Sequence, residues 1–308
     1  MSDEVEELEQ ALKKKDAALM VALTLKKRSN AERVKLRTNY KSKKGHDLID
    51  DIEKYMSGDL KSALIALFRD PIEYDAYLLY KAMKGIGSDK DVISEIICFR
   101  NFNRLTKIRE KFKEMYKKDL VSELKDETSG DYQKSILYML QNERNKNSSP
   151  NVENCRKIAE EIYNAGENKI GTNESVFIKY FTSLSPQELQ LVSKEYHKHY
   201  KKIITEVIKS EFGGNEQKLF LDIFYGLYNP SEYYARKIHD SVDGIGTADD
   251  QLIRCIVSRS EDDMDLIKRY FKQIFNKNMI ERIGEDISGD YKKLIEGLIP
   301  KDEDDEAN

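Results

Sequence analysis

Apolar residues recur along this chain at intervals of three and four positions. Four segments share the pattern, with one column at Val21, Ile93, Phe177 and Leu252 and a second, four positions later, at Leu25, Ile97, Phe181 and Ile256. Such spacing places side chains on one face of an α-helix. No segment shows a convincing period of two, the pattern of a strand. The sequence therefore predicts an all-α protein made of amphipathic helices.

The helical pattern belongs to an internal repeat. The segment Pro71-Ile-Glu-Tyr-Asp-Ala recurs as Pro230-Ser-Glu-Tyr-Tyr-Ala, and in both copies Gly-Ile-Gly begins 14 positions after the proline. Further on, Glu127-Thr-Ser-Gly-Asp-Tyr recurs as Asp286-Ile-Ser-Gly-Asp-Tyr, with the acidic residue 40 positions after the second glycine of the loop each time. Two anchors that keep one spacing indicate true repetition.

The same 40-residue spacing locates two more copies, one from Gly171 to Glu211 and a degenerate one from Lys15 to Tyr55. We therefore divide the chain into repeats at 1–70, 71–141, 155–229 and 230–300, a linker at 142–154 that is rich in Asn and Ser, and an acidic tail at 301–308. Units of this size hide their apolar faces poorly alone, so we expect the four repeats to pack together.

The paired loop and acid suit calcium, which takes six to eight oxygen ligands and accepts backbone carbonyls readily. Glycine allows the dihedral angles that point several carbonyls at one ion, and a distant carboxylate completes the charge. The predicted ligands are Met83, Gly85, Gly87 and Glu127 in the second repeat, Gly166, Lys169, Gly171 and Glu211 in the third, and Val242, Gly244, Gly246 and Asp286 in the fourth.

The alternative is that these glycines only end helices and that Ser-Gly forms a turn. For one loop alone this would be the better interpretation, but three loops with equally distant acids favour metal sites. In the first copy the loop reads Lys13-Lys14-Lys15 and the acidic position is Tyr55. This copy lacks both the glycine loop and the acid. If the glycines served only to end helices, their loss would not require the loss of a distant acid.

Charge adds a second candidate surface. The chain has 308 residues and a net charge of −4, so it is not attracted as a whole to nucleic acid or to an anionic bilayer. The first repeat is nevertheless locally basic, with a candidate patch for anionic lipid or sulfated glycan at Lys13, Lys14, Lys15, Lys26, Lys27 and Arg28. Solvated helix faces explain these cations equally well.

Other features of the sequence limit where the protein is expected to be located and which functions it is expected to have. Three cysteines, a sparse and odd number, indicate a reducing compartment. No secretory signal is visible, and no apolar run approaches the ~20 residues that a membrane-spanning helix needs. We therefore expect a cytoplasmic protein whose membrane contact is peripheral. No set of nucleophile and base is recognisable, so catalytic residues are not predicted and we expect no enzyme.

The loops and acids together resemble those of annexins. Lys84-Gly-Ile-Gly-Ser and Asp243-Gly-Ile-Gly-Thr are similar to the annexin loop Lys-Gly-x-Gly-Thr, and Arg28, Arg100 and Arg259 match a typical annexin arginine. The resemblance covers nearly the whole chain. It implies a curved disc of four repeats with about five helices each, calcium as cofactor on the convex face, and reversible calcium-dependent binding to anionic phospholipid membranes.

The short head, the degenerate first repeat and the lack of Trp also resemble α-giardins, annexin-like proteins of a flagellated protist. This narrower likeness implies association with the cytoskeleton or flagella at the inner face of the plasma membrane, and binding of glycosaminoglycans. Two functions are thus open. One is a calcium-dependent link between membrane and cytoskeleton. The other is a structural cytoskeletal or glycosaminoglycan-binding protein with weak or vestigial calcium sites.

Overall fold

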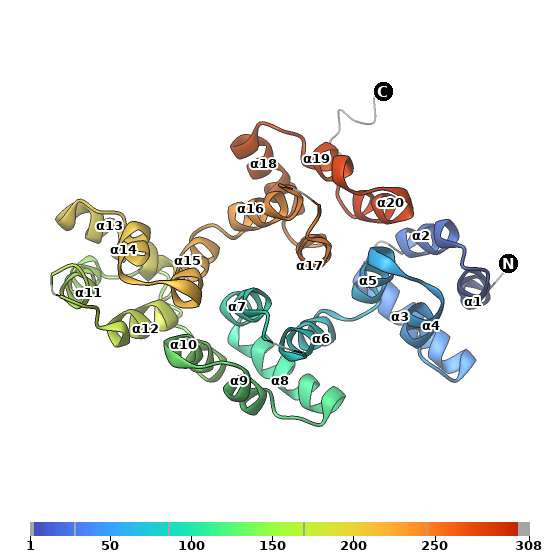
Figure 1. Ribbon diagram of the computed structural model, residues 1–308, viewed down its shortest axis with the longest axis horizontal. Coiled ribbons are helices and arrows are strands. Elements are labelled where there is room, and N and C mark those ends of the chain that lie inside the picture. Colours follow the sequence, from blue (N-terminus) through green and yellow to red (C-terminus); the bar gives the residue numbers. More distant parts are fainter. Residues whose placement is uncertain (1–2, 28, 86, 169, 245, 301–308) are drawn as a thin grey trace. The chain divides into compact units, whose positions relative to one another are not determined.

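The described part of the chain is helical. A computed structural model describes residues 3–27, 29–85, 87–168, 170–244 and 246–300, and within these ranges it contains 20 α-helices and no strand. Figure 1 shows their order along the chain. The all-α prediction is therefore confirmed. Among the same residues, no helix combines the length and the apolar character needed to cross a membrane.

The helices follow one another in four sets of five. The first set is α1 (Glu4–Lys14), α2 (Ala17–Lys26), α3 (Asn30–Lys44), α4 (Leu48–Tyr55) and α5 (Gly58–Leu67). The second is α6 (Pro71–Met83), α7 (Lys90–Phe99), α8 (Phe102–Tyr116), α9 (Leu120–Glu127) and α10 (Gly130–Gln141). The third is α11 (Val152–Ala165), α12 (Glu174–Ser183), α13 (Pro186–Tyr200), α14 (Ile204–Glu211) and α15 (Gly214–Tyr228). The fourth is α16 (Pro230–Val242), α17 (Asp249–Arg259), α18 (Met264–Phe275), α19 (Met279–Asp286) and α20 (Gly289–Gly297).

Polar residues mark where many helices begin. Asp3, Asp16, Asp89 and Asn101 each accept a backbone hydrogen bond from the first turn that follows. Ser29 and Glu32 form a reciprocal capping box at the start of α3. Such caps satisfy amide groups that have no partner inside the helix, and each stabilises a helix by about 1 kcal/mol.

The chain forms two compact units, one of Met1–Tyr74 with Ser231–Asn308 and the other of Asp75–Pro230. In the first unit α5 packs against α17 and α2 against α20. A Cβ atom added at Gly297 would lie 2.5 Å from Leu25, so glycine permits close approach of α20 to α2. In the second unit α7 packs against α15, where a Cβ atom at Gly226 would lie 2.1 Å from the ring of Phe99.

The core of the second unit contains an aromatic cluster. The ring of Phe212 lies 4.8 Å from that of Phe177 and 4.9 Å from that of Phe220, centroid to centroid, and Phe181 lies 5.3 Å from Phe220. Phe177, Phe181 and Phe220 are fully buried. Full burial of a large apolar side chain contributes roughly 1.5–3 kcal/mol, so the repeated apolar columns account for much of the stability.

The apolar column of the first repeat is displaced by one residue from its predicted place. Met20 and Thr24 are completely buried, whereas Leu25, the predicted member, is only partly buried. The amide of Met20 donates to the carbonyl of Asp16, as the amide of Ile93 donates to that of Asp89. Met20 is therefore the counterpart of Ile93, because the loop before α2 differs in length from the other loops.

Candidate calcium loops

The second-repeat loop connects α6 to α7. Gly85 and Gly87 have φ angles of 115° and 81°, in the left-handed region that residues with a Cβ atom rarely adopt. No atom lies within 4 Å of a Cβ added at either position, so the backbone conformation, not lack of space, requires glycine. The amide of Asp89 closes the loop by donating to the carbonyl of Ala82 at 2.7 Å.

The predicted acid of this repeat lies beside its loop. Glu127 is the last residue of α9, and the hydroxyl of Ser88 donates to its backbone carbonyl at 3.1 Å. Among the described residues, none donates a hydrogen bond to the Glu127 carboxylate or forms an ion pair with it. The second repeat thus brings together a carbonyl-bearing loop and a carboxylate without a partner, a donor set that fits calcium.

The third-repeat loop is one residue longer. Its closing hydrogen bond runs from the amide of Asn173 to the carbonyl of Ala165, eight positions apart, where Asp89 and Ala82 are seven apart. Gly171 has a φ of 80°. The hydroxyl of Thr172 donates to the Glu211 carboxylate at 2.6 Å, and a Cβ atom at Gly166 would lie 3.2 Å from Glu211 Cδ. Loop and acid are again adjacent; Lys169 lies outside the described residues.

The fourth-repeat loop has the geometry of the second-repeat loop, but its acid already forms an ion pair. Gly244 and Gly246 have φ angles of 121° and 82°, and the amide of Ala248 donates to the carbonyl of Ser241 at 2.8 Å. Arg282 donates from Nη2 to the Val242 carbonyl, and its Nη1 lies 3.0 Å from Asp286 Oδ1. Two predicted calcium ligands are therefore already joined by a cation of the protein.

Sequence reasoning missed Arg282, although a signal was present. The residue lies four positions before Asp286 on the same helix, a spacing at which opposite charges meet. Asp51, Glu123 and Val207 stand at the same distance before Tyr55, Glu127 and Glu211. The contact with Val242, in contrast, joins residues 40 positions apart and could not be read from helical spacing.

The first repeat lacks such a loop. Its closing hydrogen bond, from the amide of Asp16 to the carbonyl of Ala11, spans only five positions. Lys15 takes the left-handed conformation that ends α1, with a φ of 54°. Tyr55 ends α4, and the Lys54 ammonium lies 4.8 Å from its ring centroid. Two residues fewer than in the second repeat leave no segment that could aim several carbonyls at one ion.

Several cations of the basic first repeat form ion pairs with acidic residues of α1 and its cap. Lys13 pairs with Glu9 at 2.9 Å, and Lys27 with Glu4 at 2.8 Å; Lys26 lies 3.8 Å from Glu4. Further cations in this repeat, Lys43 and Lys44, pair with Asp3, Glu6 and Glu9. Of the candidate patch, Lys14 and Lys15 form no ion pair among the described residues, and Arg28 lies outside them.

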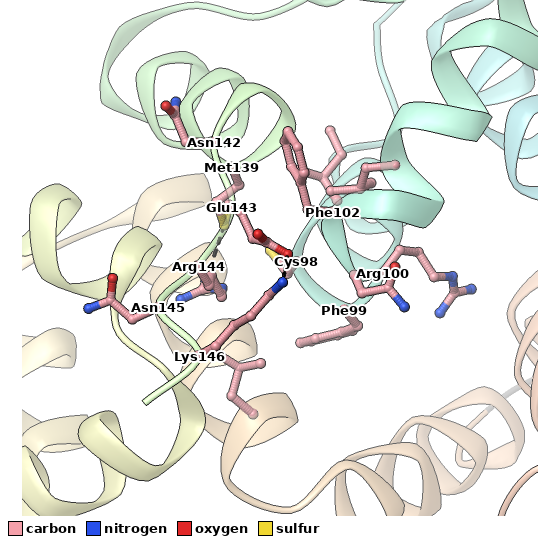
Figure 2. Close-up of a pocket in the computed structure, with 14 residues that line it drawn as sticks. Cys98, Phe99, Arg100, Phe102, Met139, Asn142, Glu143, Arg144, Asn145 and Lys146 are labelled. Atoms are coloured by element: carbon pink, nitrogen blue, oxygen red, sulfur yellow. Dashed lines mark hydrogen bonds and ion pairs between the residues drawn. The ribbon is translucent and has the colours of Figure 1, made fainter. Parts of the chain in front are cut away.

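A separate cavity of about 260 Å³ lies in the second unit, between the α7–α8 turn and the segment that follows α10. Figure 2 shows Phe99, Arg100 and Phe102 on one side and Asn142–Lys146 on the other, with Cys98 between them. Burial lowers the pKa of Arg144 to about 10, which leaves it protonated at neutral pH. Its guanidinium donates to the carbonyls of Phe181 and Leu184 at 2.7 and 3.1 Å, so Arg144 caps the end of α12.

Four five-helix segments, three of them with a paired loop and acid, define an all-α repeat protein with calcium-type donor sets. The sequence model of the annexin family matches four segments, residues 3–67, 74–139, 157–223 and 233–298. The chain belongs to the annexin family. It is 37% identical to bovine annexin A8 over 281 residues, which cover 90% of this chain and 85% of that protein.

Solved structures agree with this assignment. Annexin III has a TM-score of 0.91 at 30% identity, covering 96% of this chain and 92% of its own. A calcium-bound annexin (Sm)1 has a TM-score of 0.81 at 27% identity, covering 97% and 89%. The family relation and this calcium-bound member make calcium the cofactor that the loops are built for.

The narrower likeness to α-giardins extends to the fold alone. A calcium-bound alpha-14 giardin has a TM-score of 0.80 at 17% identity, covering 96% of this chain and 98% of its own. At that identity the comparison carries the helical architecture but no function specific to giardins. Cytoskeletal and flagellar association therefore stay predictions.

Proposed function

We propose that this annexin binds calcium at the loops of its second, third and fourth repeats and thereby docks reversibly on membranes rich in anionic phospholipid. Calcium-dependent phospholipid binding is the general property of the family. The second repeat carries the proposal, because its left-handed glycines stand beside a carboxylate that has no described partner. Coordination by Met83, Gly85, Gly87 and Glu127 would leave positions open for an oxygen of a lipid headgroup.

The chain's own residues supply the rest of the mechanism. The loops expose short backbone segments at helix corners, where a flat bilayer can reach them. Ile170, in the third-repeat loop, is fully exposed. An apolar side chain beside a metal-binding loop can enter the boundary between headgroups and acyl chains, which adds a hydrophobic contribution to an electrostatic contact. The mode of binding is peripheral, with no residue in a catalytic role.

Vesicle pelleting tests this proposal. We expect the protein to pellet with phosphatidylserine–phosphatidylcholine vesicles in calcium, and to stay in the supernatant in chelator or with phosphatidylcholine alone. The triple variant Glu127→Gln, Glu211→Gln and Asp286→Asn should lose the calcium-dependent fraction. Glu123→Gln is the matched control, since it removes a carboxylate from the same helix, α9, that pairs with Lys118 at 2.7 Å and is not a proposed ligand. Undiminished pelleting of the triple variant would refute the assignment of these carboxylates.

A second candidate function is calcium-independent binding of anionic lipid or sulfated glycan by the first repeat. The observation that favours it is small: Lys14 and Lys15 are exposed and form no ion pair among the described residues. Retention on heparin in chelator, reduced by Lys14→Glu with Lys15→Glu and not by Lys13→Gln, would support it. Equal retention of all three proteins would refute it.

The proposed setting is the cytoplasmic face of the plasma membrane, where a membrane-docked annexin could link the bilayer to cytoskeletal or flagellar proteins. The support is the resemblance of the degenerate first repeat noted above. Co-sedimentation of the protein with detergent-extracted cytoskeletons, with and without calcium, tests this link. Absence from the pellet in both conditions would leave membrane docking as the function.

A further inference from the structure

Arg282 occupies the position between two groups that the fourth repeat offers to a metal ion. Its guanidinium donates to the carbonyl of Val242, the last residue of α16, and lies 3.0 Å from the Asp286 carboxylate at the end of α19. The Arg282 side chain is only 10% exposed, and that of Asp286 is 25% exposed. A carbonyl at a helix C-terminus and a carboxylate attract any cation placed between them.

The surroundings of this guanidinium are acidic. Asp286 lines a cavity of about 410 Å³ together with Asp59, Asp249 and Asp290. Burial, with the nearby charge of Asp59, raises the pKa of Asp249. Glu285 adds a carboxylate 3.6 Å from the same guanidinium. Arg282 therefore lies beside two carboxylates of its own helix, those of Asp286 and Glu285, and the first of these also lines the acidic cavity.

No other repeat has a cation four positions before its acid. The residue four positions before the acid is Glu123 in the second repeat and Val207 in the third. Glu123 pairs with Lys118, and the Glu127 carboxylate has no partner among the described residues. The second and fourth repeats therefore share the Gly-Ile-Gly loop and the acid at the same spacing, but differ in whether the acid is already paired.

We propose that Arg282 is a tethered counter-ion that competes with calcium for Val242 and Asp286, so that the fourth site fills only at higher calcium than the second. Binding of the ion requires the guanidinium to leave both partners and enter solvent. A site that is competent for only a fraction of the time has its apparent affinity reduced by that fraction. The inference rests on the proposed function, since it requires that the fourth repeat bind calcium.

The experiment isolates the fourth site. In a Glu127→Gln, Glu211→Gln background the fourth repeat holds the remaining complete donor set, and its calcium affinity is measured by titration calorimetry with CaCl₂. We expect Arg282→Met, which keeps an unbranched side chain and removes the charge, to lower the half-saturating calcium concentration about tenfold, the change that ~1.4 kcal/mol of relieved competition gives. Arg282→Lys should lower it less. An unchanged or higher value for Arg282→Met would overturn the proposal.

Two controls keep this result separate from the proposed function. Glu285→Gln removes a neighbouring charge at the protein surface and should change the half-saturating concentration less than Arg282→Met. Failure of the otherwise unmodified protein to bind calcium would overturn both proposals together. The unmodified protein could also bind calcium while Arg282→Met leaves the affinity of the Glu127→Gln, Glu211→Gln background unchanged. That result would overturn only the role of Arg282. If Arg282→Met does not fold, Arg282→Gln, which also removes the charge, takes its place, and an unchanged half-saturating concentration there would contradict competition.

Discussion

The second and fourth repeats have the same loop and the same spacing to the acid, yet their acids differ in state. The Glu127 carboxylate, beside Gly85 and Gly87, forms no hydrogen bond or ion pair among the described residues, while Asp286, beside Gly244 and Gly246, is paired with Arg282. The loops themselves match closely, with φ angles of 115° and 81° in one and 121° and 82° in the other. The comparison shows that the loop and acid define the positions of the calcium ligands. One residue a helical turn away then decides whether those ligands already form an ion pair or hydrogen bond within the protein.

The first repeat extends this comparison. It differs from the second in loop length as well as in residue type, because its closing hydrogen bond spans five positions instead of seven. Tyr55 stands at the acid position, and four residues before it is Asp51. Asp51 accepts a hydrogen bond from Tyr40 at 2.5 Å and pairs with His46 at 2.8 Å. In the first repeat, the residue at this position is therefore engaged in contacts within the repeat.

The largest expected effect comes from breaking the loop that is ready to bind. Gly87→Val forces a β-branched residue to a φ of 81°, which costs roughly 1–2 kcal/mol and turns the Gly87 carbonyl away. We expect the calcium concentration for half-maximal vesicle binding to rise by about tenfold or more. Gly213→Ala is the control, because Gly213 has an ordinary φ of −133° and open space around it. Equal effects of the two substitutions would mean that loop conformation does not matter.

A smaller effect separates the two acids in the absence of calcium. Asp286→Asn removes one charge of the pair with Arg282, whereas Glu127→Gln removes a charge that has no described partner. In chelator we expect the first substitution to lower the thermal midpoint by about 2 °C, the shift that a partly buried pair worth about 1 kcal/mol gives. The second should leave the midpoint unchanged. Calorimetry measures both, and the reverse order would contradict the described pairing.

The smallest effect is expected in the first repeat. Tyr55→Glu restores the missing acid, but the loop remains two residues short. We therefore expect the number of calcium ions bound per chain to stay the same in a calorimetric titration. Insertion of Gly-Ile before Lys15 in the same variant tests whether loop length is the remaining obstacle. A gain of one ion from Tyr55→Glu alone would show that the acid was the missing ligand.

Local patterns were sufficient to predict much of this molecule. The helical period, the polar caps and the glycine loops each depend on residues close in sequence, and the helices observed follow from them. Long-range pairs were not predictable in this way. Lys44, for example, pairs with Glu6 at 2.6 Å and Glu9 at 2.9 Å across the first repeat.

The sequence by itself determined the four-fold repetition, the all-α fold and the residues that make up the loops and their acids, because repetition, helical period and glycine conformations are properties of short segments. Only the tertiary structure decided which of those acids is free. Arg282 meets Val242 across 40 positions because the ends of α16 and α19 converge, and electrostatic pairing depends on distance in space rather than on separation in the chain. The same reason explains why Lys13, Lys27 and Lys44 of the first repeat form ion pairs with acidic residues in the folded protein.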